Sequence, residues 1–161
     1  MGRCDLVVET SSPDETAMLG LRIAQSLRGG DVLALSGELG SGKTTFTQGL
    51  ARGLGIHAAV TSPTFVLVNR YFTPDGHVLQ HADCYRLANA SLEMWDVGLT
   101  DLYEGDDIVV IEWADRIPTL LPEEHLEIAF TYLVENRRRL CFVAHGERPA
   151  TLLTLLAAPA G

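Results

Sequence analysis

The sequence predicts one α/β domain over residues 1–161, with a mixed central sheet, flanking helices and two β-hairpins. Three observations support this. Residues 32–35 and 108–111 are continuous aliphatic runs, which are typical of strands buried on both faces of a parallel sheet. Segments with helix start and stop signals adjoin the first run. Two pairs of extended segments each flank a turn sequence, which is the pattern of β-hairpins.

The first elements can be placed from local signals. Residues 5–10 should form a short strand. A helix should follow from Ser12, whose hydroxyl can cap it, to about Arg28, with Glu15 completing a capping box. The glycine pair after Arg28 should end this helix. The aliphatic run 32–35 leads into a glycine-rich loop, and the next helix should span about residues 43–54.

The later elements depend on turn signals and apolar spacing. A Pro-Asp-Gly turn should join one hairpin, and a turn at Glu135-Asn136-Arg137 should join the other. In order, we expect strands at 64–72 and 77–85, partial helix within 90–103, a buried strand at 108–111, a short helix near 114–120, strands at 126–134 and 139–144, and a helix within 149–157.

Composition excludes several classes. The net charge of −9 disfavours direct binding to nucleic acid, so we expect no DNA partner and, at most, indirect contact with RNA. No run approaches the roughly 18 apolar residues of a membrane span, and the first five residues lack a secretion signal. Three widely spaced cysteines, Cys4, Cys84 and Cys141, favour reduced thiols over a disulfide framework or zinc site. We therefore expect a cytoplasmic protein.

The segment Gly37 to Thr44 matches the phosphate-loop pattern G-x-x-x-x-G-K-S/T, between a buried strand and a helix start. Backbone N–H groups of such a loop converge on phosphate, and the helix N-terminus adds positive potential. Lys43, the only lysine beside eleven arginines, should contact the β- and γ-phosphates, and the Thr44 hydroxyl should ligate Mg²⁺. The expected nucleotide-binding residues are Glu38, Leu39, Gly40, Ser41, Gly42, Lys43, Thr44 and Thr45.

Two carboxylates are candidates for metal binding or catalysis beside this loop. Glu112 ends the aliphatic run 108–111, where a Walker-B acid would hold the metal, although a solvent-facing glutamate is the alternative. Asp83 shares one face of its expected strand with His81 and Tyr85. It could orient a water or reach the metal through one, and spacing alone does not separate this role from that of a surface aspartate. Lys43, Asp83 and Glu112 are the candidate catalytic residues.

Two further segments have a functional and a structural interpretation each. The hydroxyls of Thr61-Ser62-Pro63-Thr64 could contact the γ-phosphate or metal, but a turn entering a strand explains them more simply. The basic run 137–139 is explained as a charged hairpin turn at a sheet edge, or it could touch a nucleotide or RNA phosphate.

Other nucleotide-binding classes lack their signatures. There is no Asn-Lys-x-Asp element and no D-x-x-G segment, which argues against guanine recognition by that route. A small-molecule kinase usually has an arginine-rich lid. Arg116 and the run 137–139 offer few arginines from which to form one. ATP, or ADP, with Mg²⁺ is therefore the expected ligand.

Four motifs in order resemble the TsaE (YjeE) family of bacterial P-loop ATPases, which act in tRNA threonylcarbamoyladenosine biosynthesis. They are Gly37 to Thr45, then Thr61-Ser62-Pro63-Thr64-Phe65, then His81-Ala82-Asp83-Cys84-Tyr85-Arg86-Leu87, then Ile111-Glu112-Trp113. The resemblance spans about residues 10–139. The phosphate loop alone is generic, whereas its combination with the other three motifs is specific.

The resemblance implies one small α/β P-loop domain that hydrolyses ATP weakly alone. It also implies partners of the TsaD and TsaB type, which move threonylcarbamoyl to adenosine in tRNA and which ATP hydrolysis would reset. Thr44 and Glu112 would hold Mg²⁺, Asp83 and the Thr61–Thr64 segment would flank the γ-phosphate, and Trp113 would lie beside the site. The family has a glycine-arginine turn near the base; here Asn136 takes that place, and it tolerates a left-handed turn.

Three functional hypotheses follow. The first is an ATPase subunit of the tRNA-modifying machinery. The second is a nucleotide-gated scaffold, in which ATP binding rather than turnover switches partner affinity. The third is a small-molecule kinase, which is disfavoured because the chain has no clear arginine-rich segment that could form a lid.

Overall fold

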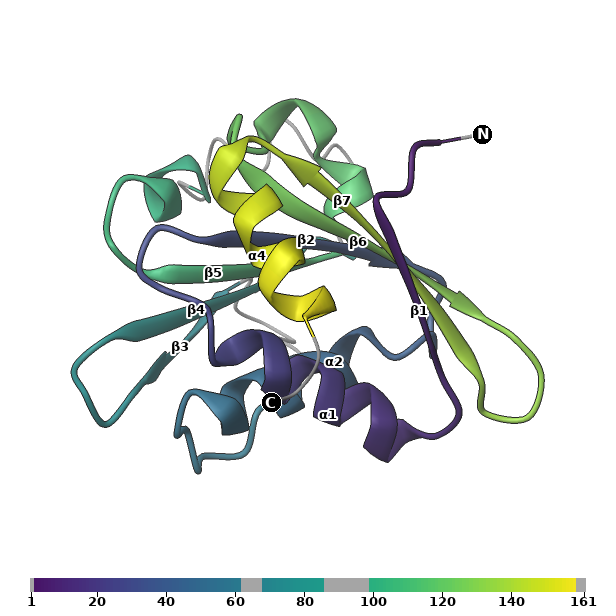
Figure 1. The fold of residues 1–161 in the computed structure, drawn as a ribbon. Helices are drawn as coiled ribbons and strands as arrows, with labels where there is room; N and C mark the ends of the chain where they lie inside the picture. The colour runs from purple at the N-terminus through teal and green to yellow at the C-terminus, as the bar shows by residue number, and fades with distance from the viewer. Residues whose placement is uncertain (1, 62–67, 86–98, 159–161) are drawn as a thin grey trace.

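The computed structural model describes residues 2–61, 68–85 and 99–158, and its elements surround one twisted sheet (Figure 1). Seven strands form this sheet in the order β1-β7-β6-β2-β5-β4-β3. Their bounds are β1 Leu6–Thr10, β2 Val32–Gly37, β3 Val68–Phe72, β4 Val78–Asp83, β5 Ile108–Glu112, β6 His125–Tyr132 and β7 Arg138–His145.

The sheet has a parallel centre and antiparallel edges. Strands β6, β2, β5 and β4 run parallel, whereas β3 pairs antiparallel with β4, and β7 pairs antiparallel with both β6 and β1. Both expected hairpins are therefore confirmed, as is the α/β class with a mixed sheet. The carboxyl ends of β2, β5 and β4 meet at one edge, where an open α/β sheet binds its ligand.

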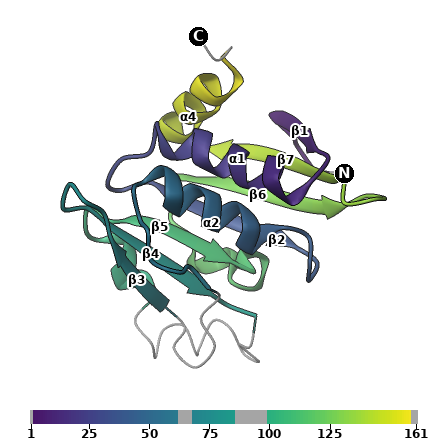
Figure 2. The ribbon, with the colours of Figure 1, turned by 90° about the horizontal axis from the view of Figure 1, so that it is seen from below.

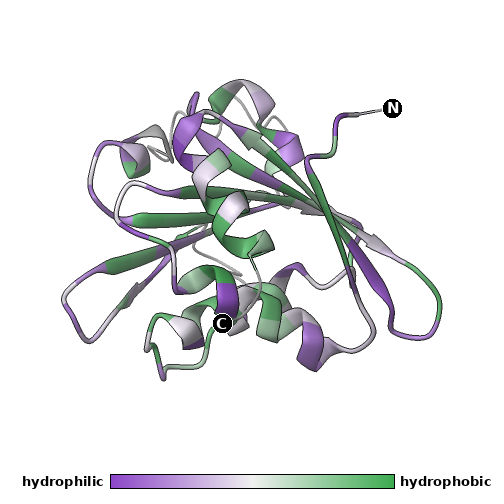
Figure 3. Cartoon of the chain, viewed as in Figure 1, coloured by the Kyte–Doolittle hydropathy of each residue, from purple (hydrophilic) through white to green (hydrophobic). Residues whose placement is uncertain are grey.

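Within the described ranges, three α-helices pack on one face of the sheet: α1 Pro13–Ala24, α2 Lys43–Gly53 and α4 Glu147–Ala157. Figure 2 shows α1 and α2 lying side by side across the strands, with α4 beyond α1. Apolar side chains of the central strands and these helices form the main core, which agrees with the hydropathy of the central strands in Figure 3. A smaller core on the opposite face lies under two 3₁₀ turns, Ala114–Arg116 and Pro118–Leu120.

Helix α1 begins as expected and ends earlier. The Ser12 side chain accepts a hydrogen bond from the Glu15 N–H at 3.1 Å, and the Glu15 carboxylate accepts from the Ser11 N–H at 3.0 Å. The helix stops at Ala24 rather than near Arg28. Beyond it, the carboxylate of buried Asp31 accepts the Arg28 N–H at 2.9 Å, and this draws the segment into a turn before β2.

The expected short helix near 114–120 is present as two separate 3₁₀ turns, with a break at Ile117. Pro118 lacks a backbone N–H and disfavours helical backbone at the preceding Ile117, which has φ −131°. Within the segment 90–103, Leu99–Tyr103 is a 3₁₀ helix and residues 90–98 lie outside the described residues. The same holds for residues 64–67 of the expected first hairpin strand.

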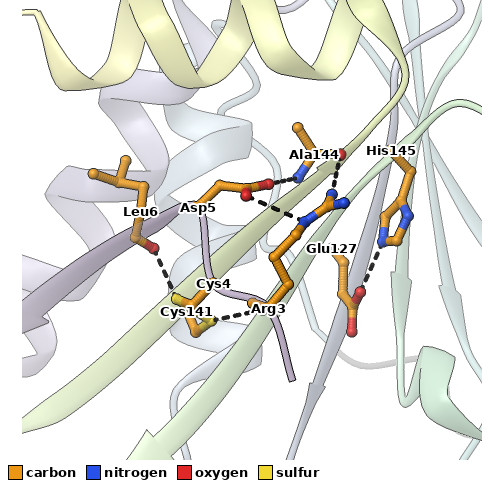
Figure 4. The surroundings of a disulfide bond; sticks show 8 residues. All are labelled: Arg3, Cys4, Asp5, Leu6, Glu127, Cys141, Ala144 and His145. Atoms are coloured by element: carbon orange, nitrogen blue, oxygen red, sulfur yellow. Dashed lines mark hydrogen bonds and ion pairs between the residues drawn. A yellow bond between two sulfur atoms is a disulfide. The ribbon is translucent and has the colours of Figure 1, made fainter. Parts of the chain in front are cut away.

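We expected all three cysteines to be reduced thiols. This is wrong for Cys4 and Cys141, which form a disulfide (Figure 4). The antiparallel pairing of β1 with β7 brings these residues together across 137 positions of sequence, with their Cα atoms 5.6 Å apart. Cysteine spacing cannot reveal such a pairing, because it depends on the strand order. Cys84 is a buried free thiol, as expected.

None of the helices in the described ranges has the length and apolar character needed to cross a membrane.

Candidate functional site

The phosphate loop joins the end of β2 to the start of α2, as the motif requires. Two of its glycines are needed for conformational and steric reasons. Gly42, at the helix N-cap, has φ +109°, which disfavours any residue with a Cβ. Gly37 has φ +140°, and a Cβ there would lie 2.6 Å from the Phe130 carbonyl oxygen. The loop can therefore turn tightly and present its backbone N–H groups above the N-terminus of α2.

Lys43 lies inside this loop and is almost fully buried. Its Nζ donates to the carbonyl oxygens of Gly37 at 2.6 Å and Glu38 at 3.0 Å, and lies 4.0 Å from the centre of the Trp113 ring. Burial lowers the pKa of Lys43, and the nearby negative charge of Glu112 partly offsets that effect. The Lys43 ammonium can exchange these carbonyl oxygens for phosphate oxygens with little movement of its side chain.

Glu112 is the last residue of β5 and is buried. One carboxylate oxygen, Oε1, accepts a hydrogen bond from the Thr44 hydroxyl at 3.0 Å, and the other, Oε2, lies 2.5 Å from His81 Nε2. Mg²⁺ prefers oxygen ligands of this kind, and a hydroxyl beside a carboxylate fits the usual metal pair of a phosphate loop. Thr44 and Glu112 therefore fit Mg²⁺. His81 is fully buried and orients the carboxylate.

Asp83 lies next to Glu112 because the two residues are paired in the parallel register of β4 and β5. Its Oδ1 accepts the Tyr85 N–H at 2.8 Å. Burial raises the pKa of Asp83, and the neighbouring charge of Glu112 raises it further. A carboxylate with a raised pKa at the mouth of a phosphate site is suited to hold a water or accept its proton.

These side chains surround a cavity of about 350 Å³, which is in the size range of small-ligand pockets. The expected residues that line it are Leu39, Gly40, Gly42, Lys43, Thr44, Thr45, Asp83 and Glu112. Trp113 also lines it and has a left-handed backbone, φ 59°, which is strained for a non-glycine residue. The expected residues Glu38 and Ser41 contact Lys43 through a carbonyl oxygen and a hydroxyl, respectively, without lining the cavity.

Asn136 has the expected left-handed turn conformation, with φ 67°, but does not line the cavity. Arg138, two residues later, does. Its guanidinium donates to the Gly40 carbonyl oxygen at 3.1 Å and stacks 4.3 Å from the Tyr132 ring centre. Alternation along β7 places Arg138 on the face of Leu140 and Phe142, toward the helices, whereas Arg139 is exposed on the other face.

Pro13 and Thr16 carried no site signal in the sequence, whereas Tyr85 belongs to the motif that begins at His81. Pro13 and Thr16, from the first turn of α1, border the cavity, and Tyr85 contacts Trp113 with ring centres 4.8 Å apart. The α1 residues reach the site because that helix packs along α2, a long-range contact. Of the Thr61–Thr64 segment, only Thr61 is among the described residues.

Known proteins of one family are similar to this chain. A family model described as "Threonylcarbamoyl adenosine biosynthesis protein TsaE" matches residues 10–140, a range that includes every cavity-lining residue. Proteins named tRNA threonylcarbamoyladenosine biosynthesis protein TsaE are similar to the chain: 41% identity in Bacillus subtilis, over 86% of this chain and 85% of the relative, and 43% in Streptomyces coelicolor, over 83% and 93%.

The fold is similar to the crystal structure of Bacillus subtilis YdiB. The TM-score is 0.81 at 34% sequence identity, and the similarity covers 98% of this chain and 97% of that one.

Proposed function

The chain belongs to the TsaE family of threonylcarbamoyl adenosine biosynthesis proteins, and from this membership we propose that it is an ATP-binding, slowly hydrolysing subunit of tRNA modification. In this proposal it supports threonylcarbamoyl transfer to adenosine in tRNA by a complex of TsaD- and TsaB-like proteins. The carrying observation is the contact between Thr44 and Glu112 beside the phosphate loop, which joins a triphosphate cradle to a metal-holding carboxylate.

Each residue has a distinct part in the proposed hydrolysis. Backbone N–H groups of the loop bind the phosphates, and the Lys43 ammonium neutralises charge at the β- and γ-oxygens. Thr44 and Glu112 would hold Mg²⁺, which supplies electrostatic stabilisation of the transferring phosphoryl group. Asp83 holds the attacking water and accepts its proton, aided by its raised pKa. Arg138 adds a cation beside Gly40 of the loop.

The charge of the chain supports an indirect relation to tRNA. The net charge is −9, and two arginines flanking Arg138 do not gather over the site: Arg137 pairs with Glu9 at 3.3 Å, and Arg139 is exposed on the other face of β7. A protein partner would therefore supply the positive surface that binds the tRNA backbone.

Nucleotide binding can be tested through Trp113. Phosphates that attract Lys43 change its contact with the Trp113 ring, so ATP should change the fluorescence of a Trp95→Phe protein, which retains Trp113 as its only tryptophan. The change should require Lys43 and disappear in a Lys43→Ala variant. Retention of the full signal in that variant would separate Trp113 from the phosphate site.

The tRNA role is tested by reconstitution with TsaD- and TsaB-like partners. The wild-type chain should sustain several rounds of tRNA modification per complex when ATP is present, and Lys43→Ala should not. Arg52→Ala is the matched control, because it removes an exposed cation at the far end of α2. Equal multiple turnover with wild-type and Lys43→Ala chains would contradict the proposal.

One observation favours the nucleotide-gated scaffold as a second candidate. Lys43 is bonded to carbonyl oxygens of its own loop, so nucleotide binding must exchange these contacts and can change the loop by itself. Glu112→Gln separates the candidates if it binds ATP without hydrolysing it. Full support of tRNA modification by that variant would favour the scaffold, and loss of multiple turnover would favour the hydrolysing subunit.

A further inference from the structure

A second cavity, of about 330 Å³, lies on the sheet face opposite α1 and α2, and it shares no lining residue with the nucleotide cavity. Strands β2 and β6, the end of β7 and the two 3₁₀ turns enclose it. Its lining residues are Ala34, Ser36, Ala114, Asp115, Pro118, Leu121, His125, Glu127 and His145. The proposed hydrolysis uses none of these side chains.

Three of the lining side chains converge because of strand register. His125 and Glu127 are two residues apart on β6, so they share a face, and His145 is paired directly with His125 across the hairpin. One ligand atom from each lies within 4.8 Å of the other two. Glu127 Oε2 accepts from His145 Nε2 at 2.9 Å, as Figure 4 shows, and the two imidazole rings stack with centres 4.3 Å apart.

His125 is already held in the form that a metal requires. Its Nδ1 lies 2.8 Å from the Pro122 carbonyl oxygen. A carbonyl oxygen can only accept, so Nδ1 carries the proton and Nε2 keeps its lone pair. A backbone carbonyl that orients the non-ligating nitrogen is a common support for metal-bound histidine.

The charge of the cavity also favours a cation. Glu127 and Asp115 contribute carboxylates, and none of the described residues that line the cavity is lysine or arginine. The side chains of Glu127 and His145 are 43% and 37% exposed, so an ion from solvent can reach both. A salt bridge alone would explain Glu127 and His145, but it would leave the orientation of His125 without a purpose.

We propose that His125, Glu127 and His145 form a site for one divalent first-row transition-metal ion of the Zn²⁺ class. Two imidazole nitrogens and one carboxylate favour such ions over Mg²⁺. Side-chain rotation would close the ligand atoms to the roughly 3.3 Å separation of a tetrahedral site. Binding through His145 Nε2 requires the proton there to leave, either by transfer to Nδ1 in the neutral ring or to solvent from the doubly protonated ring, and it leaves at least one coordination position open.

The test uses the full chain, stripped of metals and free of nucleotide. Zn²⁺ titrated in a calorimeter should bind one ion per chain, and Co²⁺ should give visible absorption bands that report imidazole coordination. His145→Ala should abolish this binding, and the nearly isosteric Glu127→Gln should weaken it at least about tenfold. His57→Ala is the matched control, since His57 is exposed and outside the cavity, and it should bind Zn²⁺ like wild type.

Thermal unfolding of each variant without metal would show whether the fold is intact, and Glu127→Gln keeps the question answerable if His145→Ala fails to fold. The proposal would be overturned if the wild type bound no Zn²⁺, or if Glu127→Gln and His145→Ala both bound Zn²⁺ as strongly as the wild type. Zn²⁺ binding that Glu112→Gln removes and His145→Ala does not would place the ion in the nucleotide cavity, with the same consequence.

Discussion

The Thr44 hydroxyl donates a hydrogen bond to Glu112 Oε1 across 3.0 Å, and this contact joins residues 68 positions apart. Thr44 lies in the first turn of α2 and Glu112 at the end of β5. The parallel pairing of β5 with β2 brings the strand end under the phosphate loop. Two oxygen atoms that can act as metal ligands therefore meet where a phosphate loop holds its metal.

From this contact we predict that Glu112→Gln lowers Mg²⁺-dependent ATP hydrolysis about 10²- to 10³-fold, because a metal ligand contributes several kcal/mol to the transition state. The variant keeps a side chain of the same size but loses the charge beside buried His81, so we expect some loss of stability, which urea titration would measure separately. Phosphate release measured against Mg²⁺ concentration checks this. Glu104→Gln, exposed and outside the cavity, should match wild type. Equal rates for the two variants would remove Glu112 from the metal site.

Asp83→Asn should raise the stability of the chain and lower its ATPase activity. Burial raises the Asp83 pKa in the folded state, so the folded chain holds that proton more tightly than the unfolded chain. The ionised carboxylate therefore costs stability once the pH exceeds the unfolded value of 3.8, fully so above the folded pKa. We expect Asp83→Asn to unfold at higher urea concentration than wild type at pH 7.5, with a gap that narrows toward acidic pH.

The same variant should hydrolyse ATP about 10²-fold more slowly, since an amide cannot accept the proton of water. Urea titrations at several pH values and a phosphate-release assay give both numbers. Asp106→Asn, an exposed aspartate, is the control for a simple change of net charge. A stability gap that grows as the pH falls would contradict the assigned burial of Asp83.

Local signals were enough to select the residues at the centre of the candidate site. Lys43 and Thr44 follow from the loop pattern, and Glu112 follows from the end of an aliphatic run, because each of these two signals lies within a short stretch of sequence. The His81 and Asp83 face was predicted by the period of a strand, but its distance from Glu112 was not. That distance depends on the register of β4 against β5, which only the fold establishes.

The unpredicted features depend on elements that are distant in sequence. Arg138 reaches the Gly40 carbonyl oxygen, and Cys141 reaches Cys4, because β7 lies between β6 and β1 at one side of the sheet. Thr16 borders the cavity at the phosphate loop through the packing of α1 on α2. Strand order and helix crossing leave no local pattern in the residues involved, so spacing and composition could not reveal them.

The close approach of α1 and α2 leads to a stability prediction. A Cβ added at Gly49 would lie 1.9 Å from the Ala17 carbonyl oxygen, a backbone atom that cannot move alone. Gly49→Ala should therefore push the helices apart and cost about 1–3 kcal/mol of unfolding free energy, measured by urea titration. Gly105→Ala has nothing within 4 Å of the added carbon and is the matched control. Equal stability of the two variants would contradict the observed packing.

Cysteine chemistry should distinguish the disulfide from the buried thiol. Burial raises the pKa of Cys84 to about 12, so at pH 8 only about one thiol in ten thousand is ionised. A thiol reagent should therefore modify no cysteine in the native chain, one after denaturation without reductant, and three after denaturation with reductant. Cys4→Ser should cost about 2–5 kcal/mol, whereas an exposed Ser11→Ala should cost little. Three reactive thiols without reductant would show that Cys4 and Cys141 are not linked.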